Sequence, residues 1–381
     1  MSDSEPLAFG LTIDNDTCST CSLCVYACPF EAISVRQLNE ERKVEVDEAK
    51  CRFCGVCYSL CPLEAIKITY YDMEGLLKQA EKLCTEAGSK SLIVACKGSN
   101  PTDKIIASRV GGEKLPVLKV PCVGRVPLDF YARLLAEGAV EKLYVLPCDE
   151  EFCRLKEGGR ISFLRVDYLQ SLLEELGAGR LLTVVKGSNK ARVDEAKCLG
   201  CGNCVHYCPY EAASLRSPGI ASIDEEKCMG CGICLAYCPN FAITLEGYEH
   251  ESLSETLRRL AGGKASILVF YCQWAYTPET SSENGSNLCF IELPCAGRVD
   301  PLHILQALNL GFKGVLILAC KQELCNFEEA GARKVEENLK NLKKLLGQLG
   351  LEGKVEIAFV SPKYPGEAGQ ALSNFISKIG G

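Results

Sequence analysis

Sixteen of the 26 cysteines in this 381-residue chain fall in four runs that share one spacing, Cys-x2-Cys-x2-Cys-x3-Cys-Pro. Thiolates spaced in this way can wrap a cuboid iron–sulfur cluster, because two residues between ligands let consecutive sulfurs reach different irons. Structural zinc sites also use Cys-x2-Cys pairs, but four tandem cysteines that close on proline are not a zinc pattern. Disulfide frameworks are found mostly in short secreted chains. The runs, which begin at Cys18, Cys51, Cys198 and Cys228, therefore predict thiolate-bound iron–sulfur clusters.

The elements that must position these cysteines repeat along the chain. Each run follows an apolar residue and an aspartate, and each is followed by a short apolar stretch. We predict a short strand, a cysteine loop, a helical turn and a second short strand for every run. Two such segments lie close together, and two more follow after about a hundred residues, which indicates a tandem duplication with a boundary near Gly187.

The stretches that follow each pair of runs also match each other. Short continuous apolar segments, such as 92–95 and 267–271, predict buried parallel strands. Helical patterns alternate with them, and the predicted helices cover residues 74–87, 127–137, 164–176 and 328–346. This alternation predicts an α/β parallel-sheet domain in each half.

Each of these domains keeps four cysteines at matching positions, three of them at the ends of predicted strands. Because the carboxyl ends of parallel strands meet at one edge of an open sheet, the strand-end cysteines and one from a following loop should converge. Four thiolates suit one further cluster, whereas the alternative is a set of buried core cysteines. The two sets are Cys96, Cys122, Cys148 and Cys153, and Cys272, Cys295, Cys320 and Cys325.

Residues 10–71 and 188–247 resemble bacterial-type ferredoxins that hold two [4Fe–4S] clusters. In such domains the fourth cysteine of each run binds the cluster of the other run. The resemblance therefore implies four ligand sets, which are Cys18, Cys21, Cys24 and Cys61; Cys51, Cys54, Cys57 and Cys28; Cys198, Cys201, Cys204 and Cys238; and Cys228, Cys231, Cys234 and Cys208.

Residues 72–187 and 248–381 resemble the delta subunit of methyl-viologen-reducing hydrogenase. The second copy carries the closer match, in the stretches 270–274, 295–301 and 320–325. The family usually has a Cys-x2-Cys pair at its first position, but this chain has Ser99 and Ala275 in place of the second cysteine. The first copy also reads Pro127-Leu128 where the second reads Asp300-Pro301. The resemblance implies one [2Fe–2S] cluster in each domain. It also implies that electrons pass between a hydrogenase or formate dehydrogenase and a heterodisulfide reductase-like flavoprotein.

Two cysteines and one histidine lie outside these sets. Cys84 shares a helical face with apolar residues and Cys289 lies in an apolar strand, so both are predicted to pack in the core. His206 stands between two cysteines of the third run, and we expect it at the surface or beside a cluster.

Basic residues raise two further expectations. Arg125 and Arg298 follow the glycine of each Cys-x-Gly-Arg stretch and should pair either with cluster charge or with a carboxylate. The lysines between positions 334 and 344 alternate with glutamates, which predicts a solvated helix face.

Composition excludes several classes of function. The net charge of −7 argues against a nucleic-acid partner, since phosphates require a basic surface. No apolar stretch is long enough to cross a bilayer, and the short polar segment from Met1 to Pro6 is no secretory signal. We therefore expect no membrane insertion and a cytoplasmic location. The sequence contains neither a glycine-rich nucleotide loop after a strand nor a recognisable nucleophile–base constellation.

Together these features predict α+β ferredoxin-like domains that alternate with α/β parallel-sheet domains in a tandem duplication. The predicted cofactors are four [4Fe–4S] and two [2Fe–2S] clusters. The predicted function is that of a non-catalytic iron–sulfur subunit that relays low-potential electrons in an anaerobe, within a complex of the heterodisulfide reductase, hydrogenase or formate dehydrogenase type. The alternative is a catalytic reductase that uses one of the second-set clusters as its substrate site.

Overall fold

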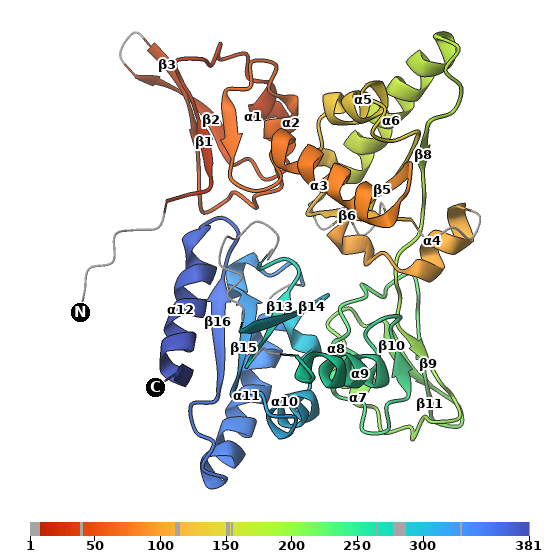
Figure 1. Cartoon of the computed structure of the whole chain (residues 1–381), viewed down its shortest axis with the longest axis vertical. Helices are drawn as coiled ribbons and strands as arrows, with labels where there is room; N and C mark the ends of the chain where they lie inside the picture. The colour runs from red at the N-terminus through yellow and green to blue at the C-terminus, as the bar shows by residue number, and fades with distance from the viewer. Residues whose placement is uncertain are drawn as a thin grey trace. The chain divides into compact units, whose positions relative to one another are not determined.

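The computed structural model describes residues 8–38, 41–110, 115–149, 153, 155–263, 266–276, 287–327 and 330–380. The chain forms two compact units, residues 9–188 and 189–381. Each unit contains two small antiparallel strand pairs and one four-stranded parallel sheet (Figure 1). The predicted mixture of two repeated domain types, one of them with a parallel sheet, is therefore confirmed. None of the described helices is long and apolar enough to cross a membrane.

In the first unit, the cysteine runs lie between antiparallel strand pairs. The elements are β1 (Leu11–Ile13), α1 (Leu23–Ala27), β2 (Ile33–Leu38), β3 (Glu41–Val46), α2 (Val56–Leu60) and β4 (Ile66–Ile68). Strand β1 pairs with β4, so the end of the second run returns beside the start of the first run. Strand β2 pairs with β3, which brings the end of the first run beside the start of the second. These pairings position each fourth cysteine near the other run.

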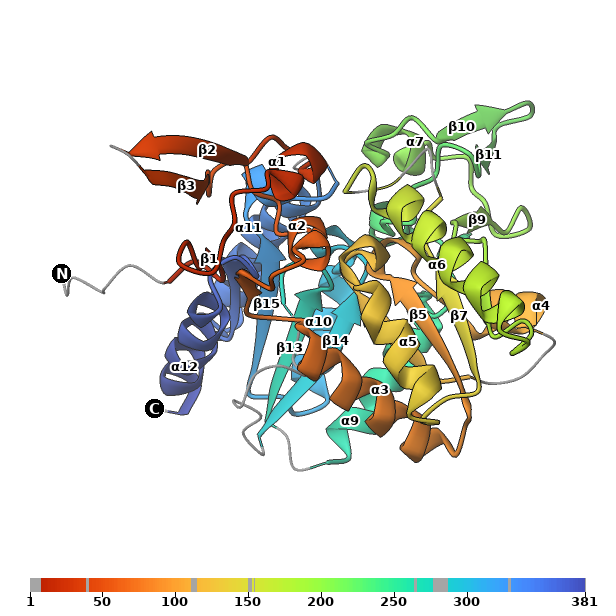
Figure 2. The same cartoon turned by 90° about the horizontal axis from the view of Figure 1, so that it is seen from above.

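The parallel sheet of the first unit has the strand order β6-β5-β7-β8. Its elements are α3 (Met73–Ala87), β5 (Ser91–Cys96), η1 (Lys97–Ser99), α4 (Asp103–Val110), β6 (Val117–Val120), η2 (Val123–Arg125), α5 (Leu128–Ala136), β7 (Lys142–Leu146), α6 (Gly158–Glu175) and β8 (Leu182–Val184). Alternate residues of β5 serve two cores: Leu92 and Val94 pack against α3, α5 and α6, whereas Ile93 and Ala95 pack toward α4. Figure 2 shows α5 and α6 side by side in front of β5 and β7.

The second unit repeats the arrangement of the cysteine runs. Its first elements are β9 (Arg192–Val193), α7 (Asn203–Tyr207), β10 (Ala213–Arg216), β11 (Ile220–Ile223), α8 (Ile233–Ala236) and β12 (Ile243–Thr244). Strand β9 pairs with β12 and β10 pairs with β11, both antiparallel. The fourth cysteine of each run is again brought to the other run.

The parallel sheet of the second unit has the equivalent order, β14-β13-β15-β16. Its elements are α9 (His250–Ala261), β13 (Ile267–Cys272), β14 (Leu288–Leu293), η5 (Ala296–Arg298), α10 (Pro301–Asn309), β15 (Gly314–Cys320), η6 (Gln322–Leu324), α11 (Ala330–Gln348), β16 (Val355–Val360) and α12 (Gly366–Gly380). Strands β13 and β15 are buried along their whole length, as expected for inner strands covered on both faces.

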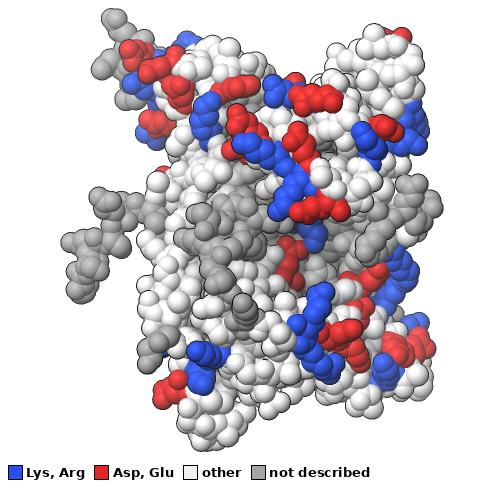
Figure 3. All heavy atoms as spheres, viewed as in Figure 1, with Lys and Arg blue, Asp and Glu red and all other residues white. Residues whose placement is uncertain are grey.

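Acidic and basic side chains of the described residues lie interspersed on the face shown in Figure 3. Some of the exposed charges pair one helical turn apart, such as Lys78 with Glu74 and Lys82 with Glu86 on α3. Exposed pairs of this kind contribute only a few tenths of a kcal/mol each, roughly 0.3–0.5. They favour solubility of the helix face more than stability of the fold.

Candidate metal centres

The strand pairings gather the cysteines of the runs around cavities. In the first unit, Cys61 of the second run lines one cavity with the first three cysteines of the first run, Cys18, Cys21 and Cys24. Cys28 of the first run lines another cavity with Cys51, Cys54 and Cys57. In the second unit, a third cavity is lined by Cys198, Cys201, Cys204 and Cys238. The three cavities enclose about 380, 330 and 350 Å³, open solvent included.

The remaining cysteines of the second unit form a fourth group. Burial raises the pKa of the Cys234 thiol, and the neighbouring sulfurs that add to the rise include those of Cys231, Cys228 and Cys208. The structure thus brings together every set of four that the sequence pattern predicts in the runs.

The backbone of each loop is shaped to fold around its cavity. The residue before each short helix is left-handed in all four loops, with φ between 65° and 78°, and it is Ser22, Gly55, Gly202 or Gly232. Glycine adopts this conformation without strain, whereas other residues lose about 1–2 kcal/mol. Ser22 keeps the same geometry without glycine, so the loop geometry holds in the run that lacks the glycines.

Backbone amides point at several of the sulfurs. Ala32 N lies 3.3 Å from Cys28 Sγ, Phe53 N lies 3.4 Å from Cys51 Sγ, and Ala242 N lies 3.2 Å from Cys238 Sγ. Amide donors of this kind stabilise negative charge on a ligating sulfur.

Burial of a thiolate is costly unless a cation compensates its charge. Burial raises the pKa of Cys54 to about 12 and raises the pKa of Cys57 well above its usual value. A thiol of this kind ionises only when a metal binds it. Four convergent thiols, between one and three of them buried in each group, form a soft donor set that fits iron–sulfur ligation.

The second set of cysteines also converges in the first unit. Cys96 ends β5, while Cys122 and Cys148 follow the ends of β6 and β7. Hydrogen bonds with the Cys122 and Cys148 sulfurs, together with burial, raise the pKa of Cys96. Cys153 joins the group, because burial and the Cys148 sulfur raise its pKa to about 11.

The second unit contains the corresponding group. Cys272 and Cys320 end the adjacent strands β13 and β15, and their Sγ atoms lie 3.5 Å apart. Burial raises the pKa of Cys295, and the Cys272 and Cys325 sulfurs add to the rise. The strand-end geometry expected from the sequence therefore brings four thiols together in each sheet domain.

A glycine at the start of the following helix makes room for each group. A Cβ added to Gly158 of α6 would lie 1.9 Å from Cys122 Sγ. A Cβ added to Gly331 of α11 would lie 2.0 Å from Cys295 Sγ and 3.7 Å from Cys325 Sγ. Any side chain at these positions would displace a sulfur.

The two kinds of cysteine group are neighbours within each unit. The Cys122 sulfur of the second set adds to the raised pKa of Cys54, after the larger effect of burial. In the second unit, the Cys231 sulfur does the same for Cys295. In each unit, cysteines of one run therefore lie next to the second-set group of the same unit.

Arg125 and Arg298 donate to backbone carbonyls. Both side chains are almost fully buried, with 0% and 1% of their surface exposed. Arg125 Nη2 donates to the Tyr70 carbonyl at 2.8 Å, and Arg298 Nη2 donates to the Tyr248 carbonyl at 2.8 Å. No carboxylate of the described residues forms an ion pair with either guanidinium.

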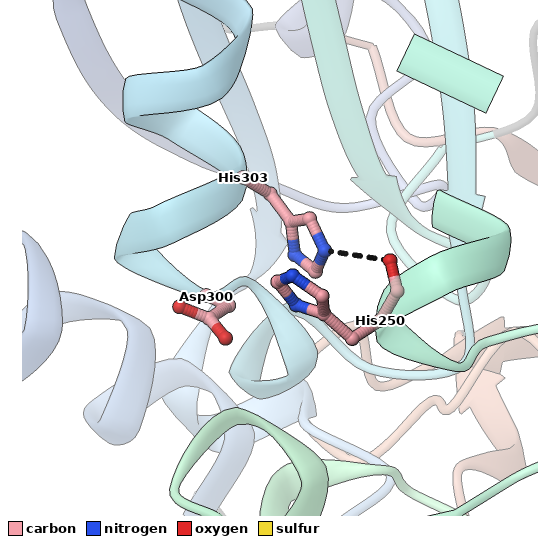
Figure 4. A group of neighbouring side chains, drawn as sticks. All are labelled: His250, Asp300 and His303. Carbon is pink, nitrogen blue, oxygen red and sulfur yellow. Dashed lines mark hydrogen bonds between the residues drawn. The ribbon is translucent and has the colours of Figure 1, made fainter. Parts of the chain in front are cut away.

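Three polar side chains gather at the start of α9 and α10, and no sequence motif indicates that they lie together. His250, Asp300 and His303 place one possible ligand atom each within 4.8 Å of the others (Figure 4). His303 Nε2 lies 3.3 Å from the His250 carbonyl, and Asp300 Oδ1 accepts from Leu302 N at 2.8 Å. The three residues are far apart in the sequence or separated by apolar positions, so only the packing of the two helices brings them together.

These residue types bind transition metals. However, burial raises the pKa of Asp300 while the positive charge of Arg298 opposes the rise, so a buried guanidinium already faces this carboxylate. A divalent cation would be repelled there. We therefore interpret the group as a polar network beside Arg298.

The structure also places the two other cysteines and the histidine of the third run. Cys84 is buried in the core beside Leu76 and Ala80, and Cys289 is half-buried on β14. His206 is exposed and contacts the edge of Tyr207.

The two positions where a second cysteine was expected carry no thiol. Ser99 is buried and its hydroxyl donates to the Cys96 carbonyl at 2.7 Å. Ala275 is buried.

Comparison with known families assigns both domain types. Residues 95–194 and 267–381 match the family described as methyl-viologen-reducing hydrogenase, delta subunit. Residues 11–68 and 191–245 match the 4Fe-4S dicluster domain. The chain therefore carries iron–sulfur domains of the [4Fe–4S] type.

Individual relatives are components of larger assemblies. The chain is 34% identical over 192 residues to one component of the ferredoxin:CoB-CoM heterodisulfide reductase of Methanosarcina mazei, covering 48% of this chain and 24% of the relative. It is 40% identical over 104 residues to the vhu iron-sulfur component of the F420-non-reducing hydrogenase of Methanopyrus kandleri, covering 25% of this chain and 78% of the relative. The iron-sulfur component of the F420-non-reducing hydrogenase of Archaeoglobus profundus is 29% identical over 122 residues, which is 30% of this chain and 88% of the relative. The chain thus spans about a quarter of the length of its heterodisulfide reductase relatives.

Proposed function

Because the chain belongs to the methyl-viologen-reducing hydrogenase delta-subunit family, we propose that it relays electrons through six iron–sulfur sites. Four [4Fe–4S] clusters would occupy the dicluster domains, 10–71 and 188–247, which we propose are ferredoxin-like domains repeated by tandem duplication. One [2Fe–2S] cluster would occupy each sheet domain, 72–187 and 248–381. The observation that carries the proposal is the convergence of thiols from distant segments in each of these places.

The ligand sets follow from the cysteines that line each cavity. We assign Cys61 to the first run and Cys28 to the second, because each shares its cavity with three cysteines of the other run. By the same reasoning, Cys238 belongs with the third run and Cys208 with the fourth. Iron–sulfur clusters supply one-electron redox chemistry when bound at such sites.

The sheet domains supply four thiols each for the remaining sites. We assign Cys96, Cys122, Cys148 and Cys153 to one and Cys272, Cys295, Cys320 and Cys325 to the other. Ser99 and Ala275 offer no further thiol, so these four are the candidate ligands in each domain.

The protein's own contribution is to hold these sites in series. Cys54 and Cys122 belong to neighbouring sites in the first unit, as do Cys231 and Cys295 in the second. These four cysteines are buried, and a backbone amide of the same domain, Ala32 N, points at a ligating sulfur, Cys28 Sγ. This arrangement supports a path between the dicluster domain and the sheet domain of the same unit.

The names of the relatives suggest the partners. We propose that the chain functions within a complex that contains a heterodisulfide reductase-like flavoprotein and a hydrogenase or formate dehydrogenase. Co-purification of the untagged partners with the full chain from anaerobic native extract tests this. A chain that elutes alone as a monomer would count against it.

Iron analysis tests the electron-carrying role itself. Anaerobically prepared full-length chain is expected to hold about twenty iron atoms, with reduced-state EPR signals from both cluster types. Iron near zero, or zinc in its place, would overturn the proposal.

A further inference from the structure

Arg125 and Arg298 are the two largest fully buried side chains among the described residues. Both lie in a short helical turn, η2 or η5, directly after a second-set cysteine. Each packs against the glycine that precedes the short helix of the adjacent cysteine run. A Cβ on Gly55 would lie 2.7 Å from Arg125 Nε, and one on Gly232 would lie 3.1 Å from Arg298 Cδ. The two arginines therefore lie between the two kinds of sulfur group.

The hydrogen bonds of these arginines are incomplete. Arg125 Nη2 donates to the Tyr70 carbonyl, but Nε and Nη1 have no hydrogen-bond partner among the described residues. The guanidinium also lies 5.3 Å from the centre of the Tyr71 ring and 5.8 Å from that of Phe53, contacts that offset only part of its desolvation. Arg298 uses Nε and Nη2 on the Tyr248 carbonyl, at 3.1 and 2.8 Å, and Nη1 has no partner there. A buried guanidinium with unsatisfied donors is costly unless negative charge lies nearby.

The charges that face the two arginines differ. Burial lowers the pKa of Arg125, and the groups that oppose this are the Tyr71 hydroxyl and cysteine sulfurs, with Cys54 first among the sulfurs. Burial lowers the pKa of Arg298 to about 10, and the charge that opposes this most is the Asp300 carboxylate. The first unit has Pro127 at the position that corresponds to Asp300. Both arginines remain charged at neutral pH.

Thiolate-bound clusters would supply the negative charge that the buried arginines lack. Reduction adds one further negative charge to such a site, and a nearby buried cation stabilises it. We propose that the guanidinium groups of Arg125 and Arg298 raise the reduction potentials of the adjacent iron–sulfur sites, an inference that rests on the proposed function. Asp300 offsets this effect in the second unit, so the site beside Arg298 is harder to reduce than the site beside Arg125.

Equivalent sites in the two units would therefore differ in reduction potential. Electrons shared between equivalent sites settle in the first unit, because only there does the buried positive charge lack a carboxylate. Arg125 and Arg298 would not bind the clusters. Their positive charges would act on the clusters through space.

An EPR-monitored redox titration of the full chain tests the proposal. Arg125→Met is expected to shift one set of signals to more negative potential, by at least a tenfold change in the one-electron equilibrium, about 59 mV. Arg125→Lys keeps the charge and should retain the wild-type potential. Arg133→Met makes the same chemical change on exposed α5 and should shift nothing, because solvent screens its charge.

Removing one carboxylate and adding another tests the difference in reduction potential between the units. Asp300→Asn keeps an N-cap oxygen for α10 and should shift the signals that respond to Arg298→Met to more positive potential. Pro127→Asp adds the missing carboxylate beside Arg125 and should shift the first unit's signals to more negative potential. Pro127→Asp leaves Arg125 in place, so it tests the same field even if Arg125→Met does not assemble.

The outcomes separate this inference from the proposed function. Wild-type chain without iron would overturn both. Variants with wild-type iron content and unchanged potentials would overturn the inference alone, as would shifts of the opposite sign.

Discussion

The Sγ atoms of Cys272 and Cys320 lie 3.5 Å apart, although 48 residues separate them in the chain. The pairing of β13 with β15 produces this contact, because both strands end at the same edge of the sheet. Two buried thiols held this close can share a proton, oxidise to a disulfide or bind one metal. This contact therefore makes the second-set site the sharpest place to test the cofactor content.

Replacement of Cys320 by serine should remove only one site. We expect Cys320→Ser to lower the iron content by about two atoms per chain and to abolish one [2Fe–2S] signal, while the [4Fe–4S] signals remain. Iron analysis and EPR of the anaerobic protein measure both effects. Cys289→Ser, on β14 and outside the group, is the matched control and should keep the full iron content. Equal losses in both variants would contradict the ligand assignment.

A methyl group at Gly331 should disturb the same site from the other side. Its Cβ would lie 2.0 Å from Cys295 Sγ, so Gly331→Ala should displace that sulfur and reduce the [2Fe–2S] signal of the second unit. Gly347→Ala, on the same helix α11, meets no atom within 4 Å and should stabilise the fold by about 0.5–1 kcal/mol. Visible absorbance and thermal unfolding distinguish the two. Wild-type absorbance in Gly331→Ala would show that the site tolerates the methyl group.

The exchange of fourth cysteines between runs has a chemical signature. Cys61→Ser should release iron from the cavity that Cys61 shares with the first run, and not from the cavity of its own run. Alkylation followed by peptide mass spectrometry reads this out. The cysteines expected to become reactive are Cys18, Cys21 and Cys24, and those expected to stay protected are Cys51, Cys54 and Cys57. The reverse pattern would assign Cys61 to its own run.

Mild acid should destabilise the second unit through His303. Burial, with the charge of Arg298, lowers the pKa of His303 to about 3. Below about pH 6.5 the His303 imidazole binds a proton in the unfolded chain but stays neutral in the folded chain. The free energy of unfolding is therefore highest above that pH and falls as the pH drops. The loss approaches about 1.4 kcal/mol per pH unit.

His303→Phe should flatten that dependence between about pH 7 and 5.5, as measured by chemical unfolding. Phe130 occupies the corresponding buried position in the first unit, so the replacement has a precedent in this chain. His206→Phe changes an exposed histidine and should leave the slope as in the wild type. An unchanged slope in His303→Phe would remove this histidine as the cause.

The spacing of the cysteines predicts the sulfur groups because ligand geometry is local and repeated. The strand-end argument predicts the second set because parallel strands share an edge. The predicted helix 127–137 corresponds to α5, Leu128–Ala136, and the helix 74–87 corresponds to α3, Met73–Ala87. The first two residues of the predicted helix 328–346 lie outside the described residues, and the rest corresponds to α11.

Packing between distant segments decides what the sequence alone does not predict. Helix α6 begins at Gly158 instead of residue 164, although glycine disfavours a helix. Gly158 leaves room for Cys122 Sγ, which no local pattern indicates. The prediction of a solvated face is wrong at Lys334, whose side chain is only 19% exposed and lies 4.9 Å from the centre of the Tyr207 ring. The burial of Arg125 and Arg298 arises in the same way, since no local pattern indicates that a run glycine will pack against them.

The cysteines of each pair of runs differ in their access to solvent. Cys21 and Cys201 are exposed, whereas Cys54 and Cys231 are buried. Dissolved oxygen and chelators would therefore reach the groups that contain Cys21 and Cys201 before those that contain Cys54 and Cys231. If clusters fill these groups as proposed, a preparation handled briefly in air would lose the clusters at Cys21 and Cys201 first. The clusters next to the sheet domains would remain, but without the exposed sites through which electrons could enter or leave.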